Sequence, residues 1–76
     1  MSETRGDIIL RATPHCWQAW SATLSLRVSR ATDPDLALLG LARILRGAAD
    51  KARFAVVAER HRAQAAIAQQ WAEELR

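Results

Sequence analysis

The residues that could take part in covalent or metal chemistry are one cysteine, Cys16, and two histidines, His15 and His61. His15 and Cys16 are adjacent, so in regular secondary structure their side chains cannot both point at one centre. With His61 as the only other histidine, the chain has no metal-ligand spacing, and nothing marks an oxyanion site or an orienting third group. The glycines are isolated and form no phosphate-binding loop. We therefore expect no enzyme activity, no metal and no cofactor, and interpret Cys16 as a small packing residue.

The distribution of charge indicates more about function than the candidate catalytic residues do. The chain carries 11 Lys and Arg against 8 Asp and Glu, a net charge of +3. The excess lies in residues 43–62, where the charged residues are Arg43, Arg46, Lys51, Arg53, Arg60 and Arg62 against Asp50 and Glu59. A basic middle indicates an anionic partner such as nucleic acid, or else a solvated face of an arginine-rich chain.

The size and composition indicate one small domain. The chain has 76 residues, and sixteen of them are alanine, which buries little area. Because a monomer would have a thin core, we expect a homodimer. A single cysteine fits a reducing compartment, and no apolar run suits a signal peptide or a membrane span. We expect a soluble cytoplasmic protein without a membrane partner, with a disordered end over residues 1–6 and one domain over residues 7–76.

The clearest pattern is the alternation of apolar and polar residues in W-S-A-T-L-S-L-R-V-S, from Trp20 to Ser29. Side chains of a strand point to opposite faces in turn, so this pattern predicts a strand. Its dry face would carry Leu24, Leu26 and Val28. A single strand cannot satisfy its own backbone groups and needs a partner. That partner is either residues 7–12, which include β-favouring Ile8 and Ile9, or the same strand of a second chain.

A helical interpretation of this region stays open. Trp17, Trp20 and Leu24 would share one face of a helix at three- and four-residue spacing, and the protein would then be an all-α three-helix bundle. Against this, the same face would carry Ser21, and the stretch is rich in weak helix formers. We therefore favour an α+β fold, with an N-terminal strand or hairpin within residues 7–29 followed by two α-helices.

Two helices follow the strand region. The first is predicted over residues 34–46, with Asp33–Pro34 at its start and Gly47 at its end. The second is predicted over residues 51–75, capped by Asp50, although one unbroken helix is the alternative. Apolar positions of the second helix repeat in steps of three and four, as in a coiled-coil seam. We expect an interface made of Phe54, Val57, His61, Trp71 and Leu75.

Three segments follow one another as strand, capped helix and second helix: T-L-S-L-R-V-S (23–29), D-P-D-L-A-L-L-G-L-A-R-I-L-R-G (33–47) and D-K-A-R-F-A-V-V-A (50–58). This order resembles the ribbon-helix-helix family of DNA-binding proteins. In that family two chains pair their strands into a ribbon that lies in the major groove, and the second helix starts at a phosphate. The resemblance implies that bases are read by Thr23, Ser25 and Arg27 and that the DNA backbone is held by Lys51 and Arg53.

Two functions follow from these patterns. The first is a small dimeric DNA-binding transcription regulator that reads the major groove of double-stranded DNA with a β-ribbon. The second is a non-enzymatic protein-binding module or inhibitor, in which residues 7–29 form a hairpin within the chain and a partner docks on that hairpin and on apolar helix faces. The two hypotheses differ in whether the strand pairs within its own chain or with a second copy.

Overall fold

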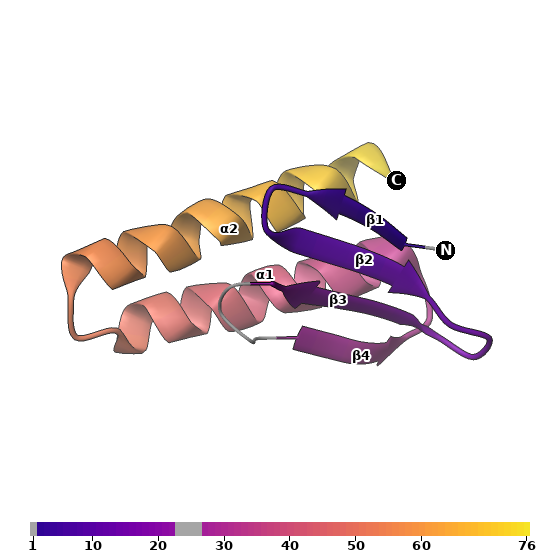
Figure 1. Cartoon of the computed structure of the whole chain (residues 1–76), viewed down its shortest axis with the longest axis horizontal. Coiled ribbons are helices and arrows are strands. Elements are labelled where there is room, and N and C mark those ends of the chain that lie inside the picture. The colour runs from indigo at the N-terminus through magenta and orange to yellow at the C-terminus, as the bar shows by residue number, and fades with distance from the viewer. Residues whose placement is uncertain (1, 23–26) are drawn as a thin grey trace.

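A computed structural model describes the backbone of residues 2–22 and 27–76, and the side chains of residues 2–22 and 31–76. Within these ranges the elements are β1 (Ser2–Arg5), β2 (Ile8–Ala12), β3 (Trp17–Ser21), β4 (Arg27–Ala31), α1 (Pro34–Lys51) and α2 (Ala55–Glu74). The strands form an antiparallel sheet in the order β1-β2-β3-β4, and the two helices form an antiparallel pair against it (Figure 1). The predicted α+β class is confirmed, and the three-helix bundle is wrong because Trp17–Ser21 is a strand.

The prediction of one continuous strand from Trp20 to Ser29 is wrong. Strand β3 ends at Ser21, Ala22 lies in a turn, and β4 begins at Arg27 and runs back antiparallel to β3. Alternation of residue types can continue through a reversal of the chain, and the connecting sequence A-T-L-S-L has no Gly, Pro, Asn or Asp to mark a turn. Both neighbours of β3 in the sheet, β2 and β4, therefore belong to the same chain.

The N-terminal residues form a strand where a disordered end was expected. Strand β1 pairs with β2 through a two-residue turn at Gly6 and Asp7, and Gly6 has a φ of 56°, in the left-handed region. At the end of β1 the Arg5 guanidinium lies 5.0 Å from the centre of the Trp71 ring and 2.8 Å from a carboxylate oxygen of Glu74. Stacking on an aromatic ring and an ion pair thus join β1 to α2.

The core lies between the sheet and the helices. Alternate residues of β2 and β3 are buried on the inner face, among them Ile8, Leu10 and Ala19. Helix α1 contributes the fully buried Leu38, Leu41 and Leu45. Helix α2 contributes mainly small residues, which let the two helices approach closely, together with one large side chain. Its buried residues are Ala58, Gln64, Ala65, Ala68, Trp71 and Ala72.

A buried polar group joins α2 to the sheet. The Ser21 hydroxyl donates to Oε1 of Gln64 at 2.5 Å, and Nε2 of Gln64 donates to a carboxylate oxygen of Asp7 at 3.1 Å. The backbone N–H of Ala22 donates to the Asp7 carbonyl at 2.8 Å. Hydrogen bonds to a charged group are stronger than neutral ones, so this chain of contacts fixes the position of α2 along the sheet.

The helix boundaries differ from the predicted ones. Helix α1 continues through Gly47 to Lys51, and α2 begins only at Ala55. Gly47 has open space beside its Cα. Glycine lowers the stability of a helix by only about 1 kcal/mol relative to alanine, which is too little to end α1 at this position. The reversal between the helices therefore lies at residues 52–54. Neither helix in the described part of the chain is long and apolar enough to cross a membrane.

Replacing Gly6 or Gly47 with alanine should change the stability of the protein in opposite directions. Gly6→Ala should lower the free energy of unfolding by about 1–2 kcal/mol, because alanine disfavours the left-handed region. A Cβ at Gly6 would also lie 3.3 Å from Cδ1 of Ile67. Gly47→Ala, in an open position inside α1, should raise the free energy of unfolding by about 0.5–1 kcal/mol. Urea denaturation of the two variants tests this, and a stabilising Gly6→Ala would contradict the β1–β2 turn.

Candidate functional site

The histidines and the cysteine have local structural roles. His15 and Cys16 lie in the loop between β2 and β3, where Thr13 Oγ1 accepts a hydrogen bond from the Cys16 N–H at 3.0 Å. His61 lies on α2 with its Nδ1 atom 2.7 Å from the Val57 carbonyl oxygen. In residues 2–22 and 31–76, no three His, Cys, Asp or Glu side chains are grouped in a way that could hold a metal ion. The surface features of the molecule are therefore the better candidates for function.

The turn between the helices carries an exposed apolar cluster. The exposed fractions are 68% for Phe54, 64% for Val56 and 38% for Val57. These residues lie at the end of the helical hairpin, which extends beyond the sheet (Figure 1). Soluble proteins rarely gather large apolar side chains on a protruding surface unless something binds there. We call these three residues, with the neighbouring Lys51 and Arg53, the hairpin tip.

The charge beside this cluster is positive. Lys51 is the last residue of α1 and Arg53 lies in the turn, and both are exposed. Among the described side chains, no carboxylate forms an ion pair with either of them. The nearby Asp50 is paired instead with Arg62 at 3.7 Å. The hairpin tip thus combines an apolar surface with two cations that are available to a partner.

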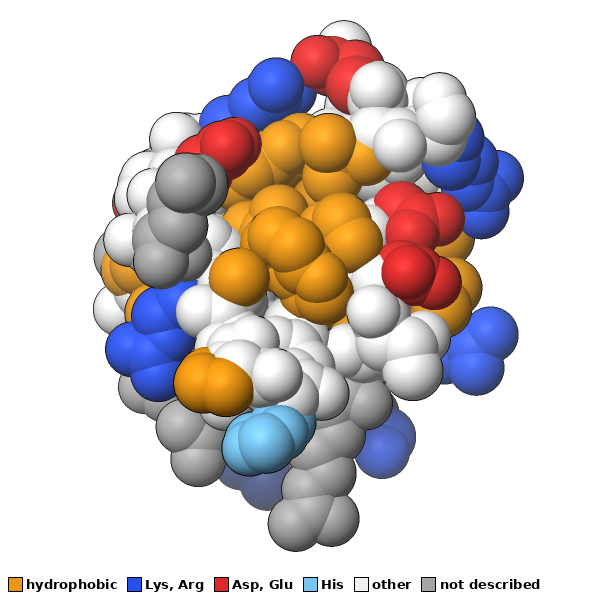
Figure 2. Space-filling model, turned by 90° about the vertical axis from the view of Figure 1, so that its right-hand side faces the viewer, with side chains coloured by type: hydrophobic (Ala, Val, Ile, Leu, Met, Phe, Trp, Pro, Cys, Tyr) orange, Lys and Arg blue, Asp and Glu red, His pale blue; other side chains and the backbone are white. Residues whose placement is uncertain are grey.

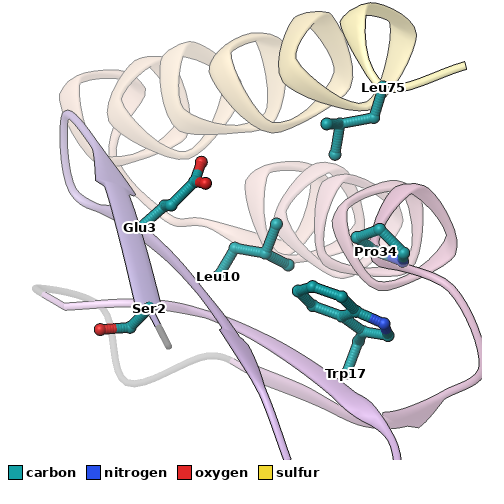
Figure 3. Close-up of a pocket in the computed structure, with 6 residues that line it drawn as sticks. All are labelled: Ser2, Glu3, Leu10, Trp17, Pro34 and Leu75. Carbon is teal, nitrogen blue, oxygen red and sulfur yellow. The ribbon is translucent and has the colours of Figure 1, made fainter.

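The opposite end of the molecule contains a cavity of about 80 Å³, which we call the end cavity. It opens between the sheet, the start of α1 and the end of α2 (Figure 3). Figure 2, which looks onto this end, shows hydrophobic side chains gathered at its centre with acidic side chains on both sides. The lining residues are Ser2, Glu3, Leu10, Trp17, Pro34 and Leu75.

A third surface is the sheet face that points away from the helices. Residues of β2 and β3 alternate, so those between the buried positions lie on this outer face. There the Arg11 guanidinium lies 5.7 Å from the centre of the Trp20 ring and donates to Oε1 of Gln18 at 3.3 Å. Trp20 is only half-buried. This face offers a cation, an amide and an aromatic ring next to one another.

The predicted DNA-reading residues can be compared with the structure only in part. Thr23 and Ser25 lie outside the described residues, as do Leu24 and Leu26, which were predicted for the core. Arg27 is the first residue of β4 and pairs in register with Trp20, but its side chain is not described. Lys51 and Arg53, predicted to hold the DNA backbone, lie together at the hairpin tip.

The five predicted interface residues lie in four different places. Phe54 and Val57 are at the hairpin tip, Trp71 is 1% exposed in the core, and Leu75 lines the end cavity. His61 is half-buried along α2. The three- and four-residue spacing selects one side of a helix, but α2 extends beyond the sheet at one end and is covered at the other. One helical stripe is therefore exposed at the tip, buried at Trp71 and partly exposed again at Leu75.

Two parts of these surfaces were missed by the sequence analysis. Val56 is at the hairpin tip, and the sequence contained a sign of its exposure. Apolar residues at positions 54, 56 and 57 point to more than one side of a helix, so one neighbouring element cannot bury all three. The end cavity had no comparable signal, because Leu10, Trp17 and Pro34 come from different elements.

No protein-family model, no curated protein and no solved structure matches this chain. The choice among these surfaces therefore rests on their geometry and chemistry.

Two aromatic residues of the same predicted seam should differ sharply in their effect on stability. Trp71→Ala should lower the free energy of unfolding by about 3–5 kcal/mol, because it leaves a cavity in the core. Phe54→Ala should change it by no more than about 0.5 kcal/mol, because that ring is exposed. Chemical denaturation at low protein concentration measures both, and a costly Phe54→Ala would mean that the ring is covered within the monomer.

Proposed function

We propose that this protein is a non-enzymatic protein-binding module that docks an acidic, partly apolar surface of a partner on its hairpin tip. The observation that carries the proposal is the exposure of Phe54, Val56 and Val57 together on a protruding turn. Aromatic side chains and arginine are enriched among the residues that dominate binding energy, whereas an apolar cluster left in water is a cost to the free protein.

The positive charge of the tip selects the chemistry of the partner. Lys51 and Arg53 flank the apolar cluster, so a partner with apolar residues next to Asp or Glu gains both burial and electrostatic attraction. Such charges act mainly on specificity and on the rate of association. An acidic partner surface is therefore favoured over a neutral or a basic one.

The rigidity of the helical hairpin supports binding at its tip. The helices pack through buried alanines, and an Arg46 nitrogen donates a hydrogen bond to Gln69 between them. Because the two helices hold the turn from both sides, docking needs little ordering of the chain. The sheet supports the same proposal, because β2, β3 and β4 pair within one chain and no second chain is needed to satisfy β3.

Binding of double-stranded DNA is a second candidate, favoured by one observation on the outer sheet face. Arg11 and Gln18 are side-chain types that form bidentate hydrogen bonds with guanine and adenine in the major groove, and they lie beside Trp20. The net charge of +3 adds general attraction to phosphate. Antiparallel strands can contact DNA in its grooves, although the resemblance to the ribbon-helix-helix family implied a ribbon of strands from two chains.

Selection of peptides against the whole protein tests the binding-module proposal. A displayed library of random peptides is panned on the immobilised chain, and bound clones are counter-screened on Phe54→Asp. We expect clones that combine apolar residues with Asp or Glu and that lose at least about tenfold in affinity on the variant, because a buried anchor at an interface contributes about 1.4 kcal/mol or more.

The matched control for this selection is Ile44→Ser, which changes an exposed apolar residue on the side of α1, 39% exposed, away from the turn. Selected clones should bind this variant as they bind the unchanged protein. Clones that ignore Phe54, or clones without an excess of acidic residues, would contradict the proposal.

Fluorescence anisotropy with a labelled DNA duplex tests the second candidate. If the outer sheet face reads DNA, Arg11→Ala should weaken binding to a preferred duplex by about 1–3 kcal/mol, the contribution of a bidentate base contact. Absence of duplex binding at low salt would exclude this candidate and leave the binding module.

A further inference from the structure

We infer that the partner of the hairpin tip is a second copy of this chain, which receives the tip in its end cavity. This inference rests on the binding-module proposal and makes it more specific, because it names the acidic, apolar surface. The contact would join unlike ends of two molecules, the tip of one and the cavity of the next.

The two surfaces lie at opposite ends of an elongated molecule. The principal extents are 38 × 21 × 17 Å. In Figure 1 the turn between α1 and α2 lies at one end of the long dimension, and the start of α1 and the end of α2, which contribute Pro34 and Leu75 to the cavity, lie at the other. The tip is a narrow projection of two helices and their turn, whereas the other end is hollowed between β1, α1 and α2 (Figure 3). A protruding surface and a hollow on the same chain can combine only between different copies.

The apolar parts of the two surfaces are complementary. Leu10, Trp17 and Leu75 line the cavity, and Leu75 is 44% exposed. A cavity of about 80 Å³ has room for several waters, each of which needs roughly 10–15 Å³. Part of the Phe54 side chain can therefore replace them. Next to Trp17 it would form an aromatic pair, which is favourable beyond the area that it buries.

The charges of the two surfaces are also complementary. Glu3 lines the cavity, and Asp33 and Asp35 are the sequence neighbours of Pro34, which also lines it. Asp35 is partly neutralised by Arg76 at 3.7 Å, whereas among the described residues no cation pairs with Glu3 or Asp33. Figure 2 shows acidic side chains on both sides of the hydrophobic centre, with Lys and Arg side chains further out. The acidic residues are the counterpart of the tip, whose charges are those of Lys51 and Arg53.

A contact between unlike ends has a specific consequence for assembly. Two bound molecules still have one free tip and one free cavity between them. Further copies can therefore add at both ends of the row, which either closes into a ring or continues as an open chain. A two-fold dimer, in which the same patch meets itself, would stop at two copies. The mass in solution therefore distinguishes the two arrangements.

Two variants disrupt the two surfaces one at a time. Phe54→Asp places a carboxylate where the tip would meet the acidic edge of the cavity, and Asp is a favourable N-cap residue for α2. Leu75→Lys places a cation in the cavity against Lys51 and Arg53, and a cation suits the end of a helix. Both substitutions are at exposed positions, so both chains should fold.

Light scattering from micromolar to millimolar concentration provides the test. The unchanged protein should rise in mass above 8.4 kDa as its concentration rises. Each variant alone should self-associate at least about tenfold more weakly, because like charges meet at the contact. An equal mixture of the two should associate more tightly than either variant alone, since it contains one intact tip and one intact cavity. Ile44→Ser should behave as the unchanged protein.

Two outcomes would overturn the inference. These are a constant mass of 8.4 kDa for the unchanged protein and variants that associate as well alone as mixed. If the mass stays constant while selected acidic peptides still depend on Phe54, the second copy is excluded and the binding module stands. If the peptides also fail to depend on Phe54, both proposals fall.

Discussion

The fold depends on one apolar face of α1 that packs against two layers at once. Leu38, Leu41 and Leu45 are fully buried between the inner face of the sheet and α2. Because α2 presents mostly alanine to this face, the helices lie close together, and Trp71 fills the space under β1. This packing closes a core within a single chain of 76 residues and holds the helices as a stiff pair beyond the edge of the sheet.

The surfaces of the molecule follow from this arrangement. The helices are longer than the sheet that they cover, so their turn, with Phe54 at its end, is left without neighbours from the sheet. At the other end, the cavity lined by Trp17 and Leu75 lies between the strands, the start of α1 and the end of α2. The unpaired Lys51 and Arg53 lie at the first end among the described side chains, and acidic side chains lie beside the hydrophobic centre of the second. A small core thus produces two unlike ends, and this polarity is the basis of the proposed docking.

Features coded by neighbouring residues could be predicted from the sequence, and features coded by distant residues could not. The α+β order and the buried side of α1 follow from local periodicity and from the start signal Asp33–Pro34. The reversal after Ser21 was missed because no turn residue marks it. Strand β1 was missed because the contact between Arg5 and Trp71 spans the whole chain. Lys51 and Arg53 were predicted to hold DNA, and Phe54 and Val57 to lie in a helical seam, each from a local pattern. The lining of the end cavity comes from separate elements.

The three tryptophans allow the most direct test of docking between the two ends, because each reports on a different part of the molecule. Trp17 lines the end cavity, Trp20 lies on the outer sheet face and Trp71 is in the core. Nuclear magnetic resonance spectra of a ¹⁵N-labelled chain, titrated with unlabelled protein, resolve the three indole N–H signals. The account predicts that the signal of Trp17 and the backbone signals of residues 51–57 shift together with concentration, while those of Trp20 and Trp71 stay in place. Unchanged signals at Trp17, or shifts confined to Trp20, would contradict it.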